Sequence, residues 1–266
     1  MSRMVQKEKS SEKRQVLISI LLAMIALVSI TAATVAWFTI ADFTKVHSMS
    51  MEITMGMNLR IDLDAHEDFD GYVKKLSFPQ IADRIQKDLG FDMRQVPLMP
   101  VTTSDGQTFT YEDGTIAEKR SGAYLEFTLH FMATDDMLVH LTSQNSGDSK
   151  DGTAVESSNS KLPDAMRISF TVENQVYIYD PGMGNDSYIK DGIRWFGLPE
   201  SDQMVLGENT RLFELEKNTD CPVVVRIWLE GTEKNCTDEI SNADYSIRLR
   251  FVGTDNEFNI LNEDGR

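Results

Sequence analysis

Cysteine is almost absent from this chain. The 266 residues contain two, Cys221 and Cys236, which is too few for a disulfide framework and provides no paired Cys-x-x-Cys zinc motif. Both cysteines flank an apolar run, so the sequence allows either one disulfide bridge between them or two free buried thiols. Cysteine usage therefore does not decide the redox compartment.

Positive charge is also scarce. The formal net charge is −16, and beyond residue 36 only 21 basic side chains face 40 acidic ones. Such a surface repels phosphate backbones, so we expect no nucleic-acid partner.

Motifs that carry catalysis are missing as well. The chain has no Gly-x-Ser-x-Gly elbow and no phosphate-binding glycine loop. The segment "HEDFD" begins like a zincin helix with His66 and Glu67, but position 70 is Asp70 where the second zinc ligand is needed. We therefore expect no enzymatic activity; the alternative is a metalloprotease-like hydrolase whose site is built from scattered residues.

Metal ligands are suggested by one acidic stretch. Calcium prefers oxygen ligands, and the candidates are Asp62, Asp64, Asp68 and Asp70. The spacing of an EF-hand is missing, and a solvated acidic loop explains the same pattern. We expect no other cofactor.

Two further histidines lie on neighbouring candidate strands. His130 and His140 would face each other if the intervening loop has an odd length. No third ligand accompanies them, so two surface histidines are the favoured interpretation.

Hydrophobicity is concentrated near the N-terminus. Residues 15–41 form 27 consecutive uncharged positions after a basic segment, residues 1–14. A helix of about 20 apolar residues spans a bilayer. The charge asymmetry predicts a cytoplasmic segment 1–14, a transmembrane anchor 15–41 and an extracellular domain 42–266. The alternative is a signal segment cleaved near Ala36, which would release the protein.

A strictly alternating run follows directly. The period-two pattern predicts a half-buried strand, broken by a bend near Gly56 because 15 residues exceed the usual strand length. We expect this face to be covered, either by the protein's own sheet or by a neighbouring molecule that accepts the strand. The apolar residues of this interaction strand are Met49, Met51, Ile53, Met55, Met57, Leu59, Ile61 and Leu63.

Strands dominate the remaining sequence. Only residues 77–90 predict a helix, with a capping box at its start and Gly90 at its end. A polar, serine-rich stretch at 143–161 predicts a mobile loop. The pattern favours a mainly β fold, an antiparallel jelly-roll-like sandwich with one short helix. The predicted strands cover residues 125–131, 166–172, 176–179, 211–215, 223–229 and 245–251.

Three segments together resemble a known group of proteins. They are "LVSITAATVAWFT" at the membrane exit, "MEITMGMNLRIDL" behind it and "VRIWLEGT" late in the chain. This layout is similar to the camelysin and TasA type of exported Gram-positive surface protein. The resemblance implies a jelly-roll-like sandwich, localisation at the cell envelope and self-association into matrix material. It carries over no catalytic residue.

The sequence therefore predicts a cell-surface protein with a structural or adhesive role. Its expected partners are the membrane, through the N-terminal segment, and further copies of itself or other surface proteins.

Overall fold

The computed structural model describes residues 18–24, 45–55, 58–142, 144–145, 152–201, 204–241 and 243–261. The chain divides into two compact units, residues 1–39 and 40–266. In the first unit, residues 18–24 are helical and their side chains are exposed. The predicted segment 1–14 and the rest of the predicted anchor lie outside the described residues. Among the described residues, no helix is both long and apolar enough to span a bilayer.

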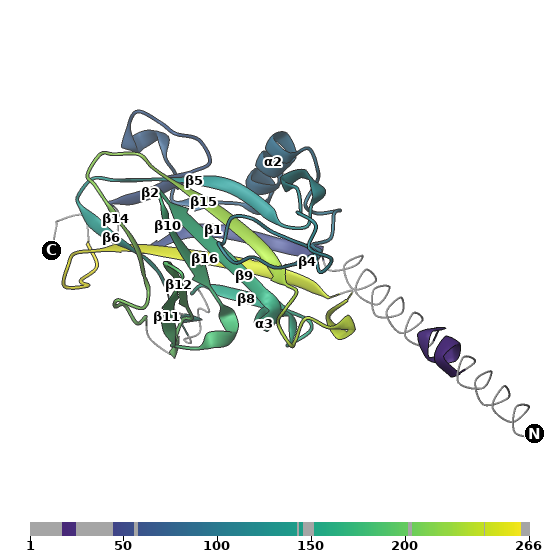
Figure 1. Cartoon of the computed structure of the whole chain (residues 1–266). Helices are drawn as coiled ribbons and strands as arrows, with labels where there is room; N and C mark the ends of the chain where they lie inside the picture. The colour runs from purple at the N-terminus through teal and green to yellow at the C-terminus, as the bar shows by residue number, and fades with distance from the viewer. Residues whose placement is uncertain are drawn as a thin grey trace, which may run out of the picture. The chain divides into compact units, whose positions relative to one another are not determined.

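Two sheets make up most of the second unit (Figure 1). The first sheet has six strands, and β16 is its centre because β1 pairs with one edge while β6 and β8 share the other. From end to end the order is β14 (Arg211–Leu215), β6 (Met137–Leu141), β16 (Asp244–Thr254), β1 (Lys45–Met55) and β3 (Lys75–Leu76), with β8 (Ala154–Ser157) beside β16.

The second sheet has eight strands, with β15 near its centre. Its order is β11 (Ser187–Lys190), β12 (Ile193–Phe196), β10 (Gln175–Tyr179), β9 (Met166–Val172), β15 (Cys221–Glu230), β5 (Leu125–Ala133) and β2 (Leu59–Asp62), with β4 (Pro100–Val101) beside β15. A separate two-stranded ladder joins β7 (Gln144–Asn145) to β13 (Glu200–Ser201).

Both sheets are mixed, which corrects the purely antiparallel prediction. The longest parallel pair is β1 with β16, and β10 with β12 and β15 with β4 are also parallel. Alternation reports which face of a strand is buried but not the direction of its neighbour. Strands β1 and β16 come from opposite ends of the domain's sequence, so no hairpin turn requires them to run in opposite directions.

The core lies between the inner faces of the two sheets. Aromatic rings from both sheets meet there: Phe131 of β5 contacts Phe213 of β14, and Phe170 of β9 contacts Phe251 of β16. The mainly β, sandwich-like prediction is confirmed.

The long alternating run is divided between the two sheets. It forms β1 up to Met55 in the first sheet and β2 from Leu59 in the second, which confirms the prediction of two shorter strands; Gly56 itself lies outside the described residues. Both strands turn the same set of alternating residues toward one shared core. The period-two pattern therefore continues although the chain changes sheet.

The predicted helix is α2 (Phe78–Leu89). The side-chain oxygen of Gln80 accepts hydrogen bonds from the backbone N–H and the hydroxyl of Ser77, and Gly90 ends the helix with φ of 85°. A residue at this position needs the left-handed conformation that glycine adopts readily. The buried stripe is Ile81, Ala82, Ile85 and Leu89, which confirms the helix in detail.

The serine-rich stretch 143–161 differs from its prediction as a loop. Residues 154–157 form β8, which pairs with β16. Only two apolar residues, Ala154 and Val155, mark this strand, and both are buried. Two apolar residues are too few to form an alternating pattern that predicts a strand within a serine-rich stretch. The remaining helical elements are α3 (Leu162–Ala165) and the single turns η1 (Phe69–Gly71), η2 (Lys119–Ser121), η3 (Pro181–Met183) and η4 (Asp238–Ile240).

A second, smaller core covers part of the outer face of the second sheet. Phe109 stacks on Tyr124 with ring centroids 4.2 Å apart and meets Trp228 of β15 edge to face at 5.1 Å. Near β2 the polar side chains of Asp62, His130 and Asp220 gather on this face instead.

Candidate functional site

The predicted interaction strand is buried within the molecule wherever its side chains are described. The backbone of its β1 part pairs with β16 and, at Met51 and Glu52, with β3, while its β2 part pairs with β5. Met55 is the last residue of β1, and Met57 lies outside the described residues. The buried side chains are Met49, Met51, Ile53, Leu59, Ile61 and Leu63. Of the two predicted kinds of cover, the structure has the protein's own sheets.

The four calcium candidates face different partners. Asp62 accepts hydrogen bonds from the backbone N–H groups of residues 63 and 64. Asp64 forms an ion pair with Arg84, which lowers the pKa of that carboxyl group, and Asp70 forms one with Arg60. Asp68 precedes the turn η1 and is exposed. Among the described residues, no three His, Cys, Asp or Glu side chains converge as a metal site. The calcium site stays a prediction.

A hydrogen-bonded network on the outer face of the second sheet joins residues that are distant in sequence. His130 of β5 places Nδ1 2.9 Å from Oδ2 of Asp220. The hydroxyl of Tyr72 donates to Oδ1 of the same carboxylate at 2.7 Å. We call Tyr72, His130 and Asp220 the outer histidine cluster. His66 extends it, since its backbone N–H donates to the Tyr72 hydroxyl and its ring packs edge to face on the Tyr72 ring.

The chemistry of this cluster follows from its contacts. The Asp220 carboxylate orients the His130 ring through Nδ1, and no hydrogen bond to Nε2 is formed among the described residues. Burial raises the pKa of Tyr72 to about 12, so the phenol remains a neutral donor. The arrangement resembles the oriented histidine of general acid–base sites.

Sequence reasoning found only part of this cluster. It singled out His66 and His130, and also Asp62, which lies outside the cluster but opposite His130 on the neighbouring strand. Tyr72 and Asp220 were missed because 148 residues separate them. Only the spatial neighbourhood of β2, β5 and β15 reveals the group.

His140 contradicts the prediction of two surface histidines, and the alternative in which His130 and His140 face each other is wrong as well. Strand β5 lies in the second sheet and β6 in the first, so His130 and His140 do not face each other. His140 is fully buried, with Nδ1 and Nε2 each 3.0 Å from the hydroxyls of Thr210 and Thr254. Burial lowers its pKa to about 4, so the ring is neutral near pH 7.

The two cysteines are free thiols. Cys221 begins β15 and Cys236 lies in the segment that follows it, and both are half-buried against the core. Burial raises the pKa of Cys221 to about 11 and that of Cys236 to about 12. Neither is therefore activated as a thiolate at neutral pH.

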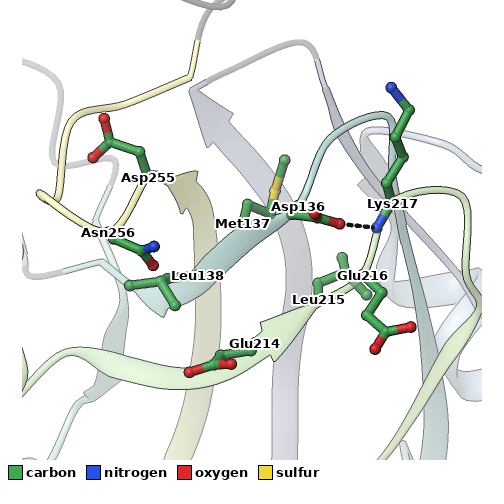
Figure 2. A pocket seen from close by; sticks show the side chains of 9 residues that line it. All are labelled: Asp136, Met137, Leu138, Glu214, Leu215, Glu216, Lys217, Asp255 and Asn256. Atoms are coloured by element: carbon green, nitrogen blue, oxygen red, sulfur yellow. Dashed lines mark hydrogen bonds between the residues drawn. The ribbon is translucent and has the colours of Figure 1, made fainter.

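An acidic pocket of about 500 Å³ lies at the ends of β6 and β14. Figure 2 shows Asp255 and Asn256 on one side, and Glu216 and Lys217 on the other. The backbone N–H of Lys217 donates to Asp136 at 2.8 Å. The full lining is Asp136, Met137, Leu138, Glu214, Leu215, Glu216, Lys217, Asp255 and Asn256. With one cationic side chain among four carboxylates, the pocket favours cationic over anionic ligands.

A second, larger pocket of about 660 Å³ also lies beside β14. Its walls are β14 from the first sheet and, from the second, residues 172–177 and 219–222. Asp220 belongs to this lining, so the pocket adjoins the outer histidine cluster.

Each sheet also ends in a strand that has only one neighbour. Within the described residues, the end strands are β14 and β3 in the first sheet and β11 and β2 in the second. Unpaired backbone groups at such an edge are available to a strand from another chain.

Comparison with known proteins gave no relative: no family model, no curated protein and no solved structure matches this chain.

Proposed function

We propose that this chain is a non-enzymatic cell-surface protein with a structural or adhesive role. Residues 15–41 anchor it in the membrane, or are cleaved near Ala36 to release it. The sandwich lies outside the cell and self-associates by strand pairing into matrix material. The jelly-roll-like assignment and the likeness to camelysin and TasA type Gram-positive proteins belong to this proposal.

One observation supports the association most directly. Strand β11 ends the larger sheet with all four of its residues exposed, among them Tyr188 and Ile189. Soluble proteins usually protect such an edge with charge, a bulge or a covering segment. Here the two large apolar side chains lie between the opposite charges of Asp186 and Lys190, and an open edge of this kind favours a function in which a further strand is added.

Protease shaving tests the location. Intact cells that express the full chain with a C-terminal tag are treated with protease, and the tag is followed by immunoblot beside a cytoplasmic control. We expect the tag to be lost while the control survives. Protection of both proteins would overturn the proposed orientation. Release of the tagged domain into the medium without protease would identify the cleaved form.

A hydrolase is the second candidate, and the outer histidine cluster favours it. If this cluster performs hydrolysis, the full chain should cleave a general protease substrate and His130→Ala should abolish the cleavage. Metal analysis of the same preparation separates a metal-dependent reaction from a direct acid–base reaction. Equal rates for the parent and His130→Ala would exclude this cluster as the active site.

A further inference from the structure

Strand β11 has an open edge. It pairs antiparallel with β12 through residues 187–190, and within the described part of the chain no strand lies on its other side. Ile189 is 75% exposed and Tyr188 is 48% exposed. These are large apolar side chains to leave in water, and they lie beside free backbone donors and acceptors.

The two faces of β11 differ. Tyr188 lies opposite Trp195 of β12, and the two rings are stacked, with an angle of 8° between their planes. Ile189 projects from the other face, opposite Arg194. One face is therefore aromatic and the other aliphatic.

Contacts to the neighbouring segment hold this edge in place. Nη1 of Arg194 donates to the backbone carbonyl of Arg211 at 2.6 Å, and Nη2 donates to that of Glu208. The hydroxyl of Ser187 donates to Oδ1 of Asn209 at 2.9 Å. A strand fixed in this way loses little conformational entropy when another strand pairs with it.

The charges at the ends of β11 are complementary to each other. Asp186 precedes the strand and Lys190 ends it, and both are exposed. Among the described residues, neither side chain has a hydrogen bond or ion pair. Their separation of four positions places both on the same face of an extended chain as Tyr188.

Symmetry then limits how two such edges can pair. When a two-fold axis stands perpendicular to the joined sheet, opposed residues of the two copies must point to the same face. An even-numbered residue therefore lies opposite an even-numbered residue of the second copy, and an odd-numbered residue opposite an odd-numbered one. A pair centred on Tyr188 places Tyr188 opposite Tyr188 of the second copy. It also places Lys190 opposite Asp186 of the second copy, and this contact occurs twice.

The alternative register is centred on Ile189. It sets Tyr188 opposite Lys190 of the second copy and leaves Asp186 beyond the paired residues. Opposite charges on facing strands stabilise a pair, so the register centred on Tyr188 is the better match.

We propose that β11 is a self-association edge, through which a second copy of this chain adds its own β11 antiparallel in the register centred on Tyr188. The joined sheet then continues from one molecule into the next, with the two tyrosines between the two Trp195 rings. This inference deepens the proposed function, on whose strand pairing it rests, and names its contact.

Charge reversal tests the register. The full chain is purified in detergent micelles, and its dimerisation is followed by sedimentation velocity. Asp186→Lys and Lys190→Asp each create two like-charge contacts, and each should weaken the dimer by roughly tenfold. The double variant Asp186→Lys/Lys190→Asp restores opposite charges and should recover the parent affinity. Parent-like dimers in both single variants, or a double variant as weak as the singles, would overturn the proposal.

Cysteine cross-linking supplies an independent measurement. Opposed residues have Cα atoms about 4.5 to 5.5 Å apart, within disulfide range, so Tyr188→Cys should yield a covalent dimer under mild oxidation. Lys190→Cys is the matched control, because its two copies would lie about 13 Å apart at 3.3 Å per residue. The parent chain reports any contribution from Cys221 and Cys236.

Cross-linking by Ile189→Cys in preference to Tyr188→Cys, or by neither variant, would overturn the proposal. Thermal melts confirm that each variant is folded. Both experiments use purified protein, so their outcome is independent of the shaving experiment: a correctly located protein that does not pair through β11 disproves only this inference.

Discussion

Phe131 of β5 and Phe251 of β16 meet edge to face between the two sheets, with ring centroids 5.1 Å apart and ring planes at 83°. Both side chains are fully buried. Each ring also contacts another phenylalanine, Phe213 or Phe170. This contact links the two sheets within the buried core.

Truncation of Phe251 tests that role. Phe251→Ala removes a ring from a closely packed interior, and we expect it to lower the free energy of unfolding by about 3 to 5 kcal/mol. Urea denaturation followed by circular dichroism measures the change. Ile116→Ala is the control, because Ile116 is 63% exposed and should change stability by less than about 0.5 kcal/mol. Equal effects of the two variants would contradict the assigned core.

Met51→Lys tests the burial of β1. Met51 is fully buried and pairs with Leu249 of β16 and Leu76 of β3. A lysine there loses its hydration without gaining a partner, so we expect the sandwich to unfold. Ser48→Lys, on an exposed position of the same strand, should leave the thermal melt near that of the parent. A folded Met51→Lys variant that fails only to assemble would instead show that β1 is exchanged between molecules.

A buried ion pair on the second sheet provides an asymmetric prediction. Nε of Arg226 donates to Oε2 of Glu126 at 2.7 Å and Nη1 to Thr171 at 2.9 Å, while Lys119 also pairs with Glu126. Glu126→Leu leaves the Arg226 cation buried without its carboxylate, at a cost of about 3 to 5 kcal/mol. Arg226→Met should cost less, because Lys119 still faces Glu126.

The double variant Glu126→Leu/Arg226→Met should recover much of the loss, because an apolar pair requires no ion to be desolvated. Urea denaturation of the four proteins completes a double-mutant cycle. Additive losses in the double variant would show that the two side chains do not interact.

The parts of the fold that were predicted correctly from the sequence are encoded by residues close together in the chain. The helix after Ser77 is encoded by neighbouring residues, from the capping contact of Gln80 to Gly90. The buried face from Met49 to Leu63 follows from alternation alone. Neither inference needs a distant residue.

The remaining features depend on contacts between distant segments. The parallel pairing of β1 with β16 leaves no trace in the alternation of either strand. His130 meets Asp220 across 90 positions, and the burial of His140 depends on Thr210 and Thr254 from two other segments. The hairpin of β11 and β12 was not predicted, because the four exposed residues of β11 show no buried face.

The buried His140 makes stability depend on pH. Its two ring nitrogens face hydroxyls, and no acidic group in the described residues forms an ion pair with it. The positive charges of Arg211 and Arg194 add to the effect of burial, which lowers the pKa from 6.5 to about 4. The folded protein therefore binds this proton less readily than the unfolded chain does.

We predict that the free energy of unfolding falls as the pH is lowered from about 6.5 to about 4. In that window the unfolded chain is protonated at His140 and the folded protein is not, so acid favours unfolding. At about 1.4 kcal/mol per pH unit, His140 contributes a loss of roughly 3 kcal/mol.

Urea denaturation at pH 7 and pH 4.5 measures the change in the parent and in His140→Gln. The variant keeps a polar side chain but has no proton to gain, so it should be less stable at pH 7 yet lose less stability on acidification. Carboxyl groups elsewhere titrate alike in both proteins, so the difference between the two pH dependences isolates His140. The same loss in both proteins would show that this histidine does not set the acid sensitivity.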